Sequence, residues 1–145
     1  MPETGKLRIL IVEDSVDTAE ILCLILQRSE HEVHCAYDGP AAIELAKQIE
    51  LDVVLLDIGL PHMDGYEVAQ KLRQGPRGAQ LQLVAITGYG GAEEIQRIRA
   101  AGCDHYLRKP IALADLKALL SAALAKKSGS TVATAPLPIA KPQTA

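Results

Sequence analysis

The sequence predicts an α/β fold: a doubly wound parallel sheet of five strands with helices on both faces. Three observations lead to this prediction. Segments of strand character alternate five times with segments of helical spacing. Three of the strand segments, 7–12, 53–57 and 81–87, are almost continuous aliphatic runs, as expected for strands that helices cover on both faces. The length of 145 residues suits one domain with a short tail.

The first half of the chain supplies three strands and the helices between them. We expect strands at 7–12, 32–37 and 53–57. Ser15 is a candidate cap for the first helix, and Asp38-Gly39-Pro40 precede the second. The predicted core-facing residues of these two helices are Ile21, Leu22, Ile25 and Leu26, then Ala42, Ile43 and Ala46.

The second half supplies strands at 81–87 and 105–109 and two helices. The segment 91–102 has acids in its first turn, arginines near its end and Gly102 where a left-handed cap would lie. Its apolar face is thin, which is typical of a helix that moves or contacts a partner and also of an ordinary edge helix. The last helix, from about 112 to 126, repeats leucine at helical spacing at positions 113, 116, 120 and 124.

Composition excludes several classes of protein. A net charge of −3 and the lack of a Lys/Arg-rich block with aromatics argue against direct binding to nucleic acid. Three widely spaced cysteines without a C-x-x-C pair indicate core residues in a reducing cytoplasm. No apolar run approaches the roughly 18 residues of a membrane span, so no membrane association is expected.

Polar side chains stand where four of the strands end. They are Glu13, Asp14, Asp57, Thr87 and Lys109. Ligands of an open parallel sheet bind outside the carboxyl ends of its strands, so these residues are expected to share one site. Three converging carboxylates repel one another unless a divalent cation such as Mg²⁺ lies between them. Taken singly, Asp14 or Ser15 could equally be an ordinary helix cap.

Four motifs resemble, in order and spacing, those of the response-regulator receiver domain of two-component signalling. They are IVEDS, LLDIGLPHMDGYE, AITGYG and HYLRKP. The resemblance covers about residues 6–126, and residues 127–145 are expected to form a disordered tail or linker. It implies a flavodoxin-like sheet in the order 2-1-3-4-5. It also implies that a histidine kinase or a histidine phosphotransfer protein supplies a phosphoryl group.

The resemblance implies a role for each site residue. Asp57 would accept the phosphoryl group. The metal, Mg²⁺ or Mn²⁺, would be held by Glu13, Asp14, Asp57 and the backbone carbonyl of Gly59. Glu13 departs from the aspartate found in many family members, but its longer side chain should still reach a metal-bound water. Thr87 and Lys109 would bind the phosphoryl oxygens.

The resemblance further implies a switch and a set of loop residues. Thr87 and Tyr106 would change position together, altering the surface around the fourth helix and fifth strand. Gly88 would leave the phosphoryl group accessible, and Gly59 and Tyr89 occupy positions that tune its hydrolysis. The bond before Pro110 is expected to be cis, which would orient Lys109.

Other readings of the residues are possible. A haloacid-dehalogenase-like hydrolase needs a second acid two residues after its nucleophile, where this chain has Gly59. A flavin carrier would share the fold but needs a phosphate loop and stacking aromatics. A receiver-like interaction module that works without phosphorylation is the main alternative. We expect no enzyme activity beyond self-phosphorylation and self-dephosphorylation, a downstream protein target, and a possible phosphorylation-dependent homodimer. The sequence does not separate a stand-alone regulator from the receiver of a hybrid kinase.

Overall fold

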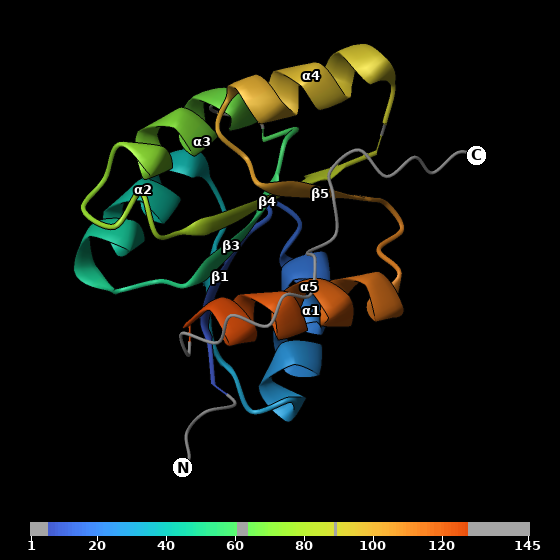
Figure 1. Ribbon diagram of the computed structural model, residues 1–145. Helices are drawn as coiled ribbons and strands as arrows, with labels where there is room; N and C mark the ends of the chain where they lie inside the picture. The colour runs from blue at the N-terminus through green and yellow to red at the C-terminus, as the bar shows by residue number, and fades with distance from the viewer. Residues whose placement is uncertain (1–5, 61–63, 89, 128–145) are drawn as a thin grey trace.

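One parallel sheet forms the centre of the molecule. A computed structural model of the chain describes residues 6–60, 64–88 and 90–127, and within these ranges it contains five strands in the order β2-β1-β3-β4-β5 (Figure 1). The strands are β1 Arg8–Val12, β2 Glu32–Ala36, β3 Val53–Asp57, β4 Gln82–Thr87 and β5 His105–Arg108. Each strand begins and ends within one residue of its predicted position. The predicted fold class and strand order are also confirmed.

Helices cover both faces of the sheet. They are α1 Val16–Arg28, α2 Gly39–Gln48, α3 Gly65–Arg73, α4 Ala92–Ala100 and α5 Leu113–Lys127. In Figure 1, α2, α3 and α4 lie on one side of the sheet, and α1 and α5 lie on the other. Side chains start two of these helices as the sequence predicted: Ser15 Oγ accepts from the amide of Thr18, and Asp38 Oδ1 from that of Ala41. Within the described ranges, none of these helices is long and apolar enough to cross a membrane.

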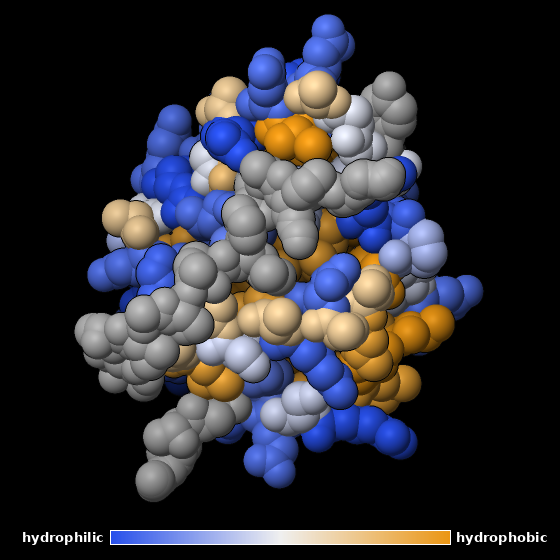
Figure 2. Space-filling view, turned by 45° about the vertical axis from the view of Figure 1, so that its right-hand side comes forward, coloured by the Kyte–Doolittle hydropathy of each residue, from blue (hydrophilic) through white to orange (hydrophobic). Residues whose placement is uncertain are grey.

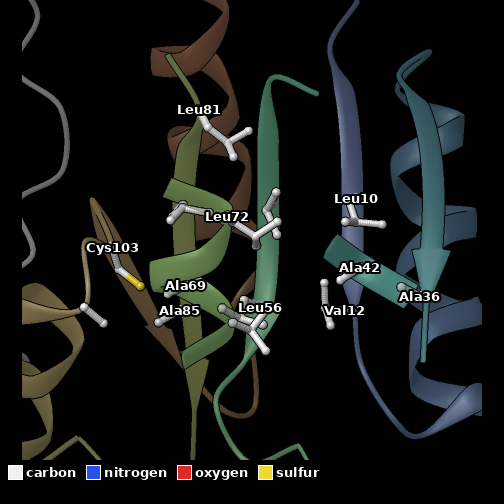
Figure 3. Packing of buried hydrophobic residues seen from close by; sticks show 14 of the residues in the cluster. Leu10, Val12, Ala36, Ala42, Leu56, Ala69, Leu72, Leu81, Ala85 and Cys103 are labelled. Atoms are coloured by element: carbon white, nitrogen blue, oxygen red, sulfur yellow. The ribbon is translucent and has the colours of Figure 1, made fainter. Parts of the chain in front are cut away.

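The sheet separates two hydrophobic cores. Alternate strand residues point to opposite faces, so Leu10 belongs to the core under α2, α3 and α4, while Ile11 belongs to the core under α1 and α5. Figure 3 shows Leu10, Val12 and Leu56 within the first of these cores. All five residues of β3 are buried, including its terminal carboxylate Asp57. Burial on both faces explains why the strand reads as a continuous apolar run.

Two residues predicted for the core lie at the surface instead. Ile21 is 59% exposed and Leu113 is 43% exposed, so both predictions are wrong. In α1 the buried residues are Ala19, Leu22 and Leu26, because the small alanine lets the helix turn that side toward the sheet. Hydrophobic side chains consequently reach the surface, and on the face seen in Figure 2 they gather toward its right-hand side.

Two helices end in a left-handed residue. Gly102 follows α4 with a φ of 103°, as the sequence predicted, and Glu30 follows α1 with a φ of 70°. The amide that follows each left-handed residue donates to a carbonyl of the last helical turn. Cys103 N–H donates to Ile98 O after α4, and His31 N–H donates to Leu26 O after α1. The same cap is therefore built once on glycine and once on a residue with a side chain.

Candidate functional site

The carboxylates predicted to converge do so at the carboxyl edge of the sheet. Val12 pairs with Leu56 across β1 and β3, which brings the residues after β1 beside the end of β3. Carboxylate oxygens of Glu13, Asp14 and Asp57 all lie within 4.8 Å of one another. Glu13 is 4% exposed and Asp57 6% exposed, whereas Asp14 is exposed to solvent. The cluster thus combines two buried acids with one that faces the solvent.

Lys109 brings a positive charge to these acids. Its Nζ lies 3.0 Å from Asp57 Oδ2 and 3.8 Å from Glu13 Oε1. The Lys109 amide donates to the carbonyl of Thr87, which fixes the backbone there. The Lys109–Pro110 peptide bond is cis, as the resemblance implied. Burial lowers the pKa of Lys109, but the hydrogen bond to Asp57 and the nearby acids outweigh it and raise the pKa overall. The lysine is therefore charged at neutral pH.

Burial makes Glu13 unusually hard to ionise. It raises the pKa of Glu13 to about 7, and the charge of Asp57 adds to this effect, although the Ser15 amide donates to Glu13 Oε2 at 3.1 Å and opposes it. Crowded carboxylates of this kind fit a hard divalent cation, which prefers oxygen ligands and offsets their repulsion. The residues present therefore fit the predicted Mg²⁺ or Mn²⁺.

Thr87 is buried at the end of β4, 3% exposed, and faces a partner that the sequence did not suggest. Its Oγ1 donates to Glu94 Oε2 at 3.0 Å. Glu94 is half-buried in the first turn of α4. The hydroxyl predicted to bind a phosphoryl group is thus hydrogen-bonded to α4.

The remaining predicted residues surround this centre. The Gly59 amide donates to Asp57 Oδ1 at 2.9 Å, which holds the carboxylate in place, while the metal-binding role of the Gly59 carbonyl stays a prediction. Gly88 is exposed, and a Cβ added there would meet no atom within 4 Å. Tyr106 is half-buried and packs against the core under α4. Tyr89 lies outside the described residues.

A family comparison agrees with this geometry. The family model of the response regulator receiver domain matches residues 9–121, most of the 145-residue chain. The chain belongs to the response-regulator receiver domain family. Its strand order, 2-1-3-4-5, is the flavodoxin-like order of that family.

Relatives place similar receiver domains in different proteins. The chain is 32% identical over 117 residues to the DNA-binding dual master transcriptional regulator RpaA of Synechocystis sp., covering 81% of this chain and 48% of that protein. It is 35% identical over 128 residues to the sensor histidine kinase RcsC of Salmonella typhi, covering 83% of this chain and 13% of that protein. The receiver domain therefore spans about half or less of these relatives.

A solved structure shows a similar receiver domain beside a phosphotransfer protein. It is the co-crystal structure of the Saccharomyces cerevisiae histidine phosphotransfer signaling protein Ypd1 and the receiver domain of its downstream response regulator Ssk1. The matched chain is 27% identical, with a TM-score of 0.74 and coverage of 81% of this chain and 88% of that one.

Sequence reasoning missed Glu94 as a neighbour of the site. Acids in the first turn of α4 complement the helix dipole, which explains them without assigning them a partner. The signal that could have separated the two acids is helical spacing: Glu94 lies four residues before Ile98, which is fully buried, whereas Glu93 does not. Glu94 thus faces the sheet, and Glu93 is exposed.

Proposed function

We propose that this receiver domain accepts a phosphoryl group on Asp57. The observation that carries the proposal is the burial of Asp57 among the acids at the carboxyl edge of the sheet, with Lys109 Nζ at 3.0 Å. A carboxylate at the end of a buried strand needs such a compensating charge. Hydrogen bonds from the Gly59 amide and Lys109 hold both of its oxygens in place.

Asp57 acts as the nucleophile in this proposal. One carboxylate oxygen attacks phosphorus, the new O–P bond forms, and the P–N bond to the donor histidine breaks, leaving an acyl phosphate on Asp57. The ammonium of Lys109 then pairs with the phosphoryl oxygens, and the Thr87 hydroxyl donates to one of them. Lys109 already contacts Asp57, whereas the Thr87 hydroxyl, which donates to Glu94, would have to turn.

Glu13, Asp14, Asp57 and the Gly59 carbonyl would hold Mg²⁺ or Mn²⁺. When bound, the metal would offset negative charge on the transferring phosphoryl group. The fit of the acid cluster to a hard cation supports this assignment.

The response to phosphorylation would be a population shift of Thr87 and Tyr106. As Thr87 turns toward the phosphoryl group, Tyr106 would move inward, and the surface of α4 and β5 would change. The thin apolar face of α4 supports this, because within its described residues only Ile98 is fully buried.

The partners in this proposal are a sensor histidine kinase or a histidine phosphotransfer protein and a downstream protein target. The likeness to RcsC and to the receiver partner of Ypd1 supports the first pair. A phosphorylation-dependent homodimer, a cytoplasmic location and the absence of enzyme turnover beyond self-phosphorylation and self-dephosphorylation stay predictions. So does the division into a domain at 6–126 and a tail at 127–145.

Intact mass after incubation with acetyl phosphate and Mg²⁺ tests the proposal. Wild-type protein should gain one phosphoryl group, Asp57→Ala should gain none, and chelating the metal should abolish the gain. A histidine-phosphorylated donor protein is the second phosphoryl source. If neither source labels the wild-type chain, the function of an interaction module that works without phosphorylation replaces the proposal.

A further inference from the structure

Glu94 connects the site to α4. Thr87 Oγ1 donates to Glu94 Oε2 at 3.0 Å, and Thr87 is fully enclosed. Gly91 starts α4 without a side-chain cap, so the first turn of this helix has no local side-chain anchor of that kind. The contact with Thr87 is therefore a tie between α4 and the end of β4, seven residues earlier in the chain.

One proton decides which acceptor Thr87 can serve. A threonine hydroxyl carries a single O–H, so it donates to one acceptor at a time. In this structure that acceptor is a carboxylate, which binds the proton more strongly than a neutral group would. A phosphoryl group on Asp57 would need the same proton, and its negative charge would repel Glu94 in a partly buried setting. The two acceptors therefore exclude each other.

A second donor near Glu94 is Tyr66 of α3, the helix that lies beside α4 in Figure 1. The hydroxyl of Tyr66 is buried and has no hydrogen-bond partner among the described residues. Its ring lies against the Arg97 guanidinium, 4.2 Å from the ring centroid. Burial raises the pKa of Tyr66 to about 12, and the hydrogen-bonding influence and the charge of the Glu94 carboxylate add to it. Glu94 therefore already lies beside the hydroxyl, although no hydrogen bond of ordinary geometry joins the two side chains. A buried phenol without an acceptor is costly, so the site favours arrival of one.

We propose that Glu94 is a latch: it holds the unphosphorylated state by accepting the Thr87 proton, and a phosphoryl group on Asp57 releases it to the Tyr66 hydroxyl. Phosphorylation in this way moves the tie of α4 from β4 to α3. The inference rests on the function proposed above, because it needs a phosphoryl group at Asp57. It adds a positioning residue that sets how readily the site is occupied.

Beryllofluoride with Mg²⁺, which mimics a phosphoryl group on a carboxylate, is the probe. Its affinity for the wild-type domain is compared with that for Glu94→Ala and Glu94→Gln, using the amide NMR signals of α4. Glu94→Ala should bind about three- to ten-fold more tightly, the range of one hydrogen bond, and Glu94→Gln should lie between the two. Glu93→Ala is the matched control, since Glu93 is an exposed acid of the same helical turn. It should bind like the wild type.

A metal-free measurement separates the latch from general electrostatics. Without beryllofluoride, Glu94→Ala should raise hydrogen exchange in the first turn of α4, whereas Glu93→Ala should not. Equal affinity gains in both variants would mean that loss of charge alone acts, which overturns the latch. Unchanged affinity in Glu94→Ala would also overturn it.

Tyr66→Phe tests where the carboxylate goes. It should weaken beryllofluoride binding about two- to three-fold in the wild type and have no effect in Glu94→Ala, because the two residues act through one contact. An equal effect in both backgrounds would remove Tyr66 from the proposal. Failure of the wild type to bind beryllofluoride, or undiminished binding by Asp57→Ala, would instead refute the proposed function.

Discussion

At the scale of single residues, buried titratable side chains lie at both ends of β1. Glu13 and Asp57 are almost fully enclosed, yet both carry carboxylates, and Lys109 contacts both. At the amino end of β1, His31 is 9% exposed and its Nδ1 accepts from the Leu7 amide at 3.1 Å. Burial raises the pKa of Glu13 to about 7 and lowers the pKa of His31.

Replacing Glu13 by glutamine should separate stability from metal binding. The amide keeps an acceptor for the Ser15 N–H but removes a buried charge that lies beside Asp57. Without metal, Glu13→Gln should raise the unfolding free energy by about 1 kcal/mol, and its Mg²⁺ affinity should fall. Calorimetry in EDTA and then in Mg²⁺ measures both quantities. A less stable metal-free variant with unchanged Mg²⁺ affinity would contradict the assigned role.

The His31 contact should make stability depend on pH. Burial disfavours the charged ring and lowers the pKa of His31 from its ordinary value of 6.5. The neutral ring accepts from the Leu7 amide. The unfolded chain then binds the proton more readily, so this contribution is present above pH 6.5 and is lost as the pH falls below it. His31→Asn can keep an acceptor that does not titrate, and should flatten the decline in chemical-denaturation midpoints between about pH 7 and pH 5. An unchanged decline would exclude His31 as its source.

The location of the site could be predicted from sequence because it depends only on where the strands end. Residues at the carboxyl ends of parallel strands lie at the same edge of the sheet, so Glu13, Asp57 and Thr87 are expected at one edge once the strands are identified. The contact between Thr87 and Glu94 depends on how α4 is rotated and on a side-chain torsion. Neither follows from strand spacing, and acids near a helix start have a simpler explanation.

At the scale of elements, one arginine ties three segments together. Arg73, the last residue of α3, donates to the carbonyls of Gly78 and Leu81 before β4, and to the carbonyl of Gly102 after α4. It also pairs with Asp104, whose carboxylate accepts from the amide of Leu83 in β4. Only a guanidinium has enough fixed donors to serve all of these acceptors.

The two left-handed helix ends form a matched pair. Gly102→Ala should lower the unfolding free energy by about 1 kcal/mol, because a Cβ is disfavoured at a φ of 103° even though it would only touch Arg73. Glu30→Gly should raise it by about 0.5 kcal/mol, since relief at a φ of 70° exceeds the added freedom of the unfolded chain. Urea midpoints of both variants measure this. A change of the same sign in both would show that backbone conformation is not the cause.

Helix faces were harder to predict than helix positions. Ile21 and Leu113 have the right residue type for a core, and both are exposed. Isoleucines and leucines occur on more than one side of α1, so several rotations of the helix would turn a similar number of apolar side chains toward the sheet. Periodicity alone does not select one of these rotations. The packed alanines, such as Ala19, decide the rotation through close approach to the sheet, which a hydrophobicity pattern does not report.

At the scale of the whole molecule, an ion pair holds the end of the last helix, α5, against the amino edge of the sheet. Lys127 Nζ lies 3.1 Å from Asp52 Oδ2, and the same carboxylate accepts from the amide of Arg8 at 2.8 Å. Asp52 is 9% exposed, so removing a cation from it is unfavourable. The helix extends one residue into the segment predicted as a tail.

Truncation tests the predicted domain boundary. A chain that ends at Lys127 should melt at the temperature of the full chain, because the contacts described above are complete within it. A chain that ends at Ala125 loses the partly exposed pair with Asp52 and should melt about 2 °C lower. Differential scanning calorimetry of the three chains measures the effect. A lower melting temperature for the chain ending at Lys127 would mean that residues 128–145 stabilise the domain.

Because the sheet separates the two cores, natural selection can act on the residues of each core separately. Leu10 and Ile11 are neighbours in the chain but pack in different compartments, which share little beyond the backbone of the strands. Substitutions under α1 and α5 are therefore nearly independent of substitutions under α4. One core can therefore change its side chains while the packing of the other is kept. A fold arranged in this way can change the residues of one face at a time.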